Sequence, residues 1–207
     1  YMLTYIPLGG RNMLRNISSR LTDKLIAQKE FCHYDRDVYI YGIELIISTL
    51  AGLISIIGVS KLYSCTILGV IFIIFFVPLR LFTGGYHANT YGKCYFVSIL
   101  SFGILLSIQY FSWNKISSLF WLFLLLVADF YICKNAPMIN RNQEISPQKK
   151  QISKAMARKI VFVEGVLILL LAIVDKRIMS MAVLSVWLVV IFMLLANKYF
   201  QKGVERS

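Results

Sequence analysis

The sequence predicts an all-α protein: a polytopic bundle of about six transmembrane helices, preceded by an amphipathic helix at the membrane interface. Two observations predict this fold. Hydrophobic residues make up 58% of the 207 residues and charged residues only 15%, whereas soluble domains carry about 45–50% apolar and about 25% charged residues. The apolar residues also occur in long uninterrupted runs, which is typical of helices whose outer faces contact lipid.

An amphipathic pattern occupies residues 11–30. Leu14, Ile17, Leu21 and Leu25 follow one another at spacings of three and four, with basic residues between them. The pattern predicts a helix that lies in the membrane interface, although an ordinary surface helix packed on the protein would show the same pattern. We therefore divide the chain into a cytoplasmic or interfacial segment, residues 1–39, and an integral membrane domain, residues 40–207.

Six apolar segments follow the amphipathic pattern. They cover residues 40–60, 65–81, 94–111, 116–133, 160–174 and 178–197. Several are shorter than the ~20 residues that a straight span needs. The shortest, 160–174, contains Glu164 and is compatible with a short span or with a re-entrant element.

Basic residues are distributed unevenly between the predicted loops. The formal net charge is +12, from 22 Lys and Arg against 10 Asp and Glu. With six spans, 18 Lys and Arg fall on one side and 4 on the other. The positive-inside rule then places both termini, the 82–93 loop and the 134–159 loop in the cytoplasm. Because this rule and the lipid bilayer account for the charge, we expect no nucleic-acid partner.

The 82–93 loop contains the residues best suited to catalysis. Gly84, Gly85 and Gly92 interrupt the helical pattern between two spans, and glycine lets the backbone adopt positive φ and approach a ligand closely. His87 lies in this loop and Cys94 follows it. A thiolate attacks a peptide carbonyl, and imidazole can remove the thiol proton and protonate the leaving amine.

Spacing and environment bear on this pair. Seven residues of continuous helix rise about 10 Å, too far for a direct hydrogen bond, so a loop folded back at the glycines is required. Cys94 would then lie near the N-terminus of the third span, which favours a thiolate and supplies backbone N–H groups for an oxyanion hole. By itself, such a pair is more often a loop histidine and a small packing cysteine.

Other chemistry is also compatible with the sequence. A zinc site from Cys32, His33, His87 and Cys94 fits no common ligand spacing, so we expect no metal and no cofactor. Four irregularly spaced cysteines, which include Cys65 and Cys133, argue against a disulfide framework.

Carboxylates within apolar runs should face the bundle interior and find a partner. They are Glu44, Asp129 and Glu164. One of them, or Asn89, could orient His87; alternatively, they pair with Arg80 or Lys159 between helices. A small transporter or channel that uses these carboxylates is the competing function.

The stretch Arg80…Gly84-Gly85-Tyr86-His87-Ala88…Cys94 closely resembles the signature of the accessory gene regulator B (AgrB) family, membrane endopeptidases of Gram-positive quorum sensing. The resemblance extends to the length, the six apolar segments and the basic loop that begins at Asn135-Ala136-Pro137.

The resemblance implies a reaction and a partner. The substrate would be a small AgrD-like propeptide, cleaved through a peptidyl thioester on Cys94, with His87 as general base and acid. A propeptide cysteine would then attack the thioester to form a thiolactone ring. Arg80, Gly84 and Gly85 would bind substrate or support the site, and the family suggests a homodimer. Glu44, one of the carboxylates of the apolar runs, is a further candidate for such support. Lys149 and Lys150 match the family's basic loop, which would hold an acidic propeptide tail.

Overall fold

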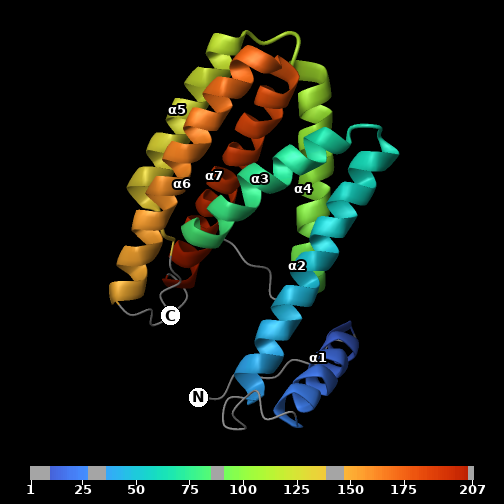
Figure 1. The fold of residues 1–207 in the computed structure, drawn as a ribbon. Helices are drawn as coiled ribbons and strands as arrows, with labels where there is room; N and C mark the ends of the chain where they lie inside the picture. Colours follow the sequence, from blue (N-terminus) through green and yellow to red (C-terminus); the bar gives the residue numbers. More distant parts are fainter. Residues whose placement is uncertain (1–9, 28–35, 85–90, 139–146, 205–207) are drawn as a thin grey trace. The chain divides into compact units, whose positions relative to one another are not determined.

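The computed structural model describes residues 10–27, 36–84, 91–138 and 147–204, and Figure 1 shows that these residues form helices joined by short connections. The all-α polytopic class is therefore confirmed. The helices are α1 (Gly10–Ala27), α2 (Arg36–Leu62), α3 (Thr66–Thr83), α4 (Tyr91–Ser112), α5 (Ser118–Asn135), α6 (Pro147–Val174) and α7 (Lys176–Val204).

Helix boundaries follow local chemistry where the sequence offers a signal. Ser117 caps α5, because its side chain accepts a hydrogen bond from the N–H of Phe120 at 3.3 Å. Pro147 opens α6, at the first helical position, where a missing N–H costs nothing. Helix α3 ends at Thr83 because Gly84 adopts φ 67°, a conformation that ends a helix and suits glycine.

The chain forms two compact units, and α2 and α4 each pass from one to the other. The first unit is Tyr1–Ser55 with Ala88–Ile99, and the second is Ile56–His87 with Leu100–Ser207. The boundary near residue 39, which separates an interfacial segment from a membrane domain, stays a prediction. In the first unit, the Ser55 and Tyr95 hydroxyls are 2.6 Å apart and link α2 to α4.

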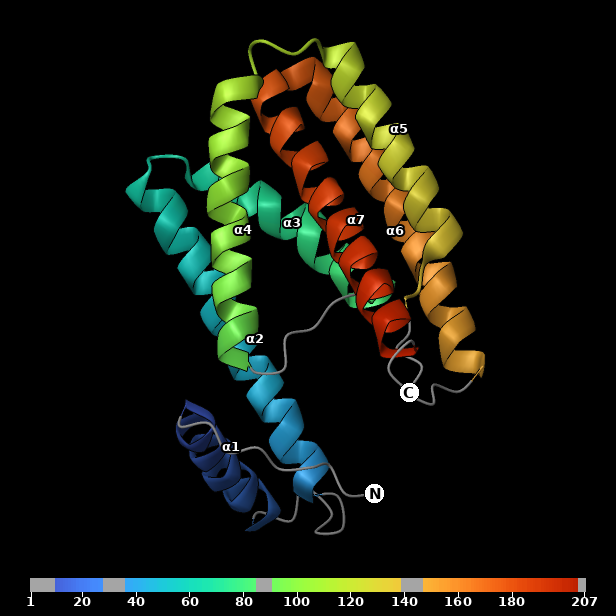
Figure 2. The same cartoon turned by 180° about the vertical axis from the view of Figure 1, so that it is seen from behind.

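In the second unit, α7 is the central helix. It contacts α3, α5 and α6, and both views show α5, α6 and α7 side by side (Figures 1 and 2). Residues Met179, Ala182, Val186, Val189 and Met193 of α7 are fully or almost fully buried. A hydrogen bond of 3.0 Å from Trp187 Nε1 to the carbonyl of Leu124 fixes α7 against α5.

Five of the described helices are long and apolar enough to cross a membrane: α2, α3, α4, α5 and α7. Helix α6 does not qualify because its first half is strongly basic. It is nevertheless one continuous helix that runs opposite to α5 and α7 (Figure 2), rather than a re-entrant pair. Helix α5 ends and α6 begins at one end of the unit, and α6 ends next to the start of α7 at the opposite end. Helix α6 therefore runs the length of the unit, as a sixth membrane crossing would.

Candidate functional site

The described residues include only part of the predicted site. Arg80 lies in the last turn of α3, Gly84 follows that helix, and Cys94 belongs to the first turn of α4. Gly85 and His87 lie outside the described residues, as does the side chain of Cys94. The pairing of Cys94 with His87 therefore stays a prediction.

Gly84 is fixed where the glycine-rich loop begins. The Met138 N–H donates a hydrogen bond of 2.8 Å to the carbonyl of Thr83, and Gly84 and Met138 form an isolated parallel β-bridge. A Cβ added to Gly84 would lie 2.5 Å from the Met138 carbonyl oxygen. Both its φ and its surroundings therefore require glycine at this position.

Arg80 contacts the same residue. Its Nη1 donates a hydrogen bond to the carbonyl of Gly84. Its guanidinium carbon lies 5.0 Å from the centre of the Phe192 ring of α7, within the range of a cation–π contact. Phe192 itself is buried and contacts Phe76 of α3, with ring centres 5.9 Å apart. Arg80 thus connects α3 to α7.

We call Arg80, Gly84, Met138 and Phe192 the clasp. The sequence indicated the first two residues, whereas Met138 and Phe192 carried no signal. Met138 contributes its backbone, which no side-chain motif can reveal. Phe192 is one of many apolar residues in the run 178–197, and only its contact with Arg80 distinguishes it.

The two lysines assigned to the basic loop belong to a helix. Lys149 and Lys150 lie in the first turn of α6, and the Lys150 side chain is exposed. The expected 134–159 loop is therefore helical from Pro147 onward, because proline suits the first helical position and Gln and Lys favour helices. The positive end of the α6 dipole adds to the lysine charge at this point.

Two of the three carboxylates of the apolar runs, Asp129 and Glu164, lie near each other in the second unit. Glu44 is buried in α2, within the first unit. Glu164 is 5% exposed in α6, on the same face as the buried residues Val161 and Ile168, and neither of its oxygens has a hydrogen-bond partner among the described residues. Asp129 of α5 is half-buried near Gly165, where an added Cβ would lie 3.5 Å from its Oδ2.

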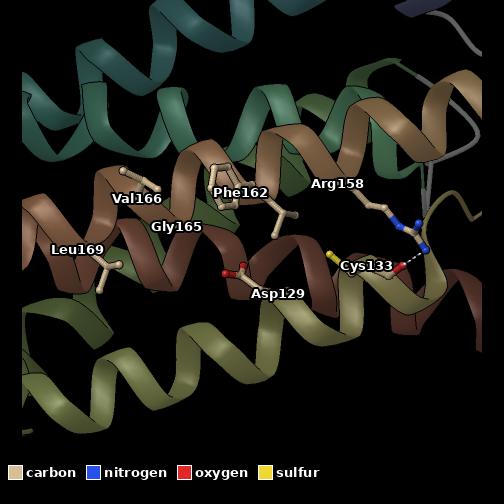
Figure 3. A pocket seen from close by; sticks show the side chains of 8 residues that line it. Asp129, Cys133, Arg158, Phe162, Gly165, Val166 and Leu169 are labelled. Carbon is tan, nitrogen blue, oxygen red and sulfur yellow. Dashed lines mark hydrogen bonds between the residues drawn. The ribbon is translucent and has the colours of Figure 1, made fainter.

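Asp129 also lines an open groove between α5 and α6, shown in Figure 3. The groove has mostly apolar walls, and at one end Arg158 Nη2 lies 3.5 Å from the carbonyl oxygen of Cys133, a weak hydrogen bond. Within the described ranges, no three His, Cys, Asp or Glu side chains are placed to hold a metal ion.

The sequence has recognisable relatives. The sequence model of AgrB, accessory gene regulator B, matches residues 18–194. Two AgrB-like proteins of Clostridium perfringens, one from strain SM101 / Type A and one from strain 13 / Type A, are each similar to this chain. Each is 22% identical over 144 residues, which cover 67% of this chain and 67% of the relative. No solved structure matches.

Proposed function

Because the chain belongs to the accessory gene regulator B family of membrane peptidases, whose members process AgrD propeptides, we propose that it is a cysteine endopeptidase acting on an AgrD-like propeptide. Cys94 is the nucleophile and His87 is the general base and acid. The observation that carries the proposal is the stretch from Arg80 to Cys94, set in a chain that matches the family from residue 18 to residue 194.

The reaction balances without a cofactor. The Cys94 sulfur attacks the scissile carbonyl as His87 takes the thiol proton, and the tetrahedral intermediate then expels the amine, to which His87 returns that proton. This leaves a thioester on Cys94 and a free C-terminal peptide. The propeptide's own cysteine then attacks the thioester, which forms a thiolactone and restores the Cys94 thiol. Water must be kept away, because it would hydrolyse the thioester.

The position of Cys94 supports its role. The first turn of a helix presents backbone N–H groups without intrahelical partners, which can stabilise the oxyanion. Gly84, with its positive φ, directs the chain out of α3 and into the loop that carries His87.

We infer that the site faces the cytoplasm. In the second unit α6 runs opposite to α5 and α7, which supports six crossings. With six crossings, 18 Lys and Arg fall on the side of the site and 4 on the other side. The apolar part of α6, residues 160–174, is roughly 22 Å long at 1.5 Å per residue. This is shorter than the ~30 Å hydrocarbon core, so Arg158 and Lys159 would extend their charged ends toward the headgroups.

Lys149 and Lys150 suit the capture of an acidic propeptide segment. They lie at the N-terminus of α6, where their charge and the helix dipole have the same sign. They are point charges on flexible stems rather than a rigid binding fork. Their contribution is therefore to propeptide affinity and not to the chemical step.

We also place α1 at the membrane interface. Among its described side chains, from Arg15 onward, Ser18 and Thr22 are buried, while Ile17 and Leu21 are 43% and 42% exposed and Arg20 and Lys24 are exposed. An apolar face left uncovered by protein and flanked by basic residues suits an anionic lipid surface.

Hydrogen bonds from Arg36 hold α1 close to the start of α2. Arg36, which begins α2, donates hydrogen bonds of 2.9 Å to Asp23 and 2.8 Å to Ser19 of α1. The bond to Asp23 raises the pKa of Arg36. The candidate span of α2 begins six residues later, at Gly42.

Substitution of the two catalytic residues tests the function. In membranes that contain a tagged AgrD-like propeptide, Cys94→Ser should abolish cleavage, because a hydroxyl is activated poorly by a base suited to a thiol. His87→Ala should slow cleavage by about 10²- to 10⁴-fold, and the double variant should be hardly slower than either single one. Serine variants of Cys32, Cys65 and Cys133 should cleave normally. Processing by Cys94→Ser at the wild-type rate would refute the peptidase and favour the transporter.

A further inference from the structure

The clasp fixes the start of the catalytic loop through three elements of the second unit. Arg80 comes from α3, Phe192 from α7, and Met138 from the segment that follows α5. Two residues contact this turn. Arg80 donates a hydrogen bond to the Gly84 carbonyl. The Met138 backbone donates to the Thr83 carbonyl and passes so close to Gly84 that an added Cβ would lie 2.5 Å from the Met138 carbonyl oxygen. Gly84 therefore has little freedom to shift or rotate.

This restraint matters because the loop is short. His87 is three residues beyond Gly84, and three residues of chain reach at most about 11 Å. The position of Gly84 therefore limits the region in which the His87 backbone can lie. Catalysis is sensitive to errors of position, since a misplacement of about 1 Å can cost 10²-fold in rate.

Arg80 makes more contacts than are needed to satisfy the carbonyl groups at the C-terminus of α3. A water molecule or a lysine could satisfy the last carbonyls of α3. Instead, the planar guanidinium donates to the Gly84 carbonyl and also lies over the Phe192 ring, which restricts its orientation. Phe192 thus contributes to the direction from which Arg80 contacts Gly84.

We propose that Phe192 and the Met138 backbone are positioning elements of the catalytic site, which act through Arg80 and Gly84 on the loop that carries His87. This inference rests on the proposed peptidase function. Neither element contacts the reacting atoms. Their loss should therefore lower the rate of acyl transfer at saturating propeptide while leaving the propeptide KM almost unchanged.

Variants of Phe192 test the ring contact in the full chain, reconstituted in lipid nanodiscs. Phe192→Leu removes the aromatic face, and we expect kcat to fall about 2- to 30-fold, the range for one cation–π contact. Phe192→Tyr keeps that face and should restore the rate. The matched control is Phe72→Leu, a fully buried α3 phenylalanine that stacks on Phe76. It should lower thermal stability as much as Phe192→Leu does, without the fall in kcat.

Variants of residue 138 test the backbone contact and cover the case in which Phe192→Leu does not fold. Met138→Ala keeps the N–H that bonds to Thr83 and should retain wild-type kcat. Met138→Pro removes this donor, and we expect it to lower kcat at least 10-fold. The clasp is refuted if Phe192→Leu affects kcat no more than Phe72→Leu, or if the Pro and Ala variants of Met138 have equal rates.

Alkylation of Cys94 distinguishes failure of this inference from failure of the peptidase. With Cys32, Cys65 and Cys133 changed to Ser, N-ethylmaleimide at neutral pH reports the reactivity of Cys94 alone. His87→Ala and Phe192→Leu should both slow the reaction. A slow reaction in His87→Ala and a wild-type rate in Phe192→Leu would overturn only the clasp. A wild-type rate in His87→Ala, together with propeptide cleavage by Cys94→Ser, would overturn the peptidase itself.

Discussion

Glu164 should destabilise the protein, and its replacement by leucine should stabilise it. The side chain is 5% exposed, on the buried face of α6, and neither carboxyl oxygen has a hydrogen-bond partner among the described residues. A buried polar group left without a partner costs about 1–3 kcal/mol. Glu164→Leu removes both oxygens, while Glu164→Gln leaves a polar group in the same place. We expect the Glu164→Leu variant to be clearly more stable than the wild-type protein, and the Glu164→Gln variant to differ little from it.

The expected shift is measurable by thermal unfolding in nanodiscs. For a chain of this size, 1 kcal/mol corresponds to roughly 2–4 °C in Tm, so Glu164→Leu should raise Tm by roughly 2–12 °C. The control is Gln151→Leu, an exposed position of α6, which should shift stability by less than about 0.5 kcal/mol. A lower Tm for Glu164→Leu would show that the carboxyl has a partner and refute this reasoning.

The same variant separates the two candidate functions. If the protein is a peptidase that does not use Glu164 chemically, Glu164→Leu should cleave the propeptide at close to the wild-type rate. If it is a transporter that uses intramembrane carboxylates, this substitution should abolish its activity. If Glu164→Leu is more stable and still cleaves the propeptide, Glu164 takes part neither in peptide cleavage nor in transport.

Three further predictions concern the surroundings of the site. Changing Lys149 and Lys150 to Gln should raise KM for the propeptide and reduce the salt dependence of cleavage; an unchanged salt dependence would exclude them from capture. Cysteines introduced at Leu62 and Ala88 should be labelled from opposite sides of the membrane, and labelling from one side would refute six crossings. A bimane label at Ile17→Cys should be quenched by brominated anionic lipids, whereas no quenching would place α1 away from the bilayer.

Much of the fold could be predicted from local patterns. Apolar runs located α2, α3, α4, α5 and α7, because a helix that sees lipid must be apolar over most of its length. Helix α6 was the exception. Its basic first half looked like loop in sequence, since charge is the usual mark of a cytoplasmic connection, but those lysines lie on a helix that begins at Pro147. Helix propensity and charge were in conflict there, and propensity prevailed, since the described side chains of residues 147–156 are mostly exposed and the buried face of α6 begins at Ala157.

The sequence by itself determined the membrane class, the family and the chemically capable residues, because composition, Gly-rich spacing and reactive side chains are local properties. Only the tertiary structure showed which residues contact the loop that carries the catalytic candidates. Met138 meets Gly84 across 54 positions of sequence and Phe192 meets Arg80 across 112, and neither pairing leaves a periodic or compositional trace. Contacts of this kind depend on how α3, α5 and α7 pack together, since a backbone N–H and a buried ring acquire their roles only from the neighbours that the fold gives them.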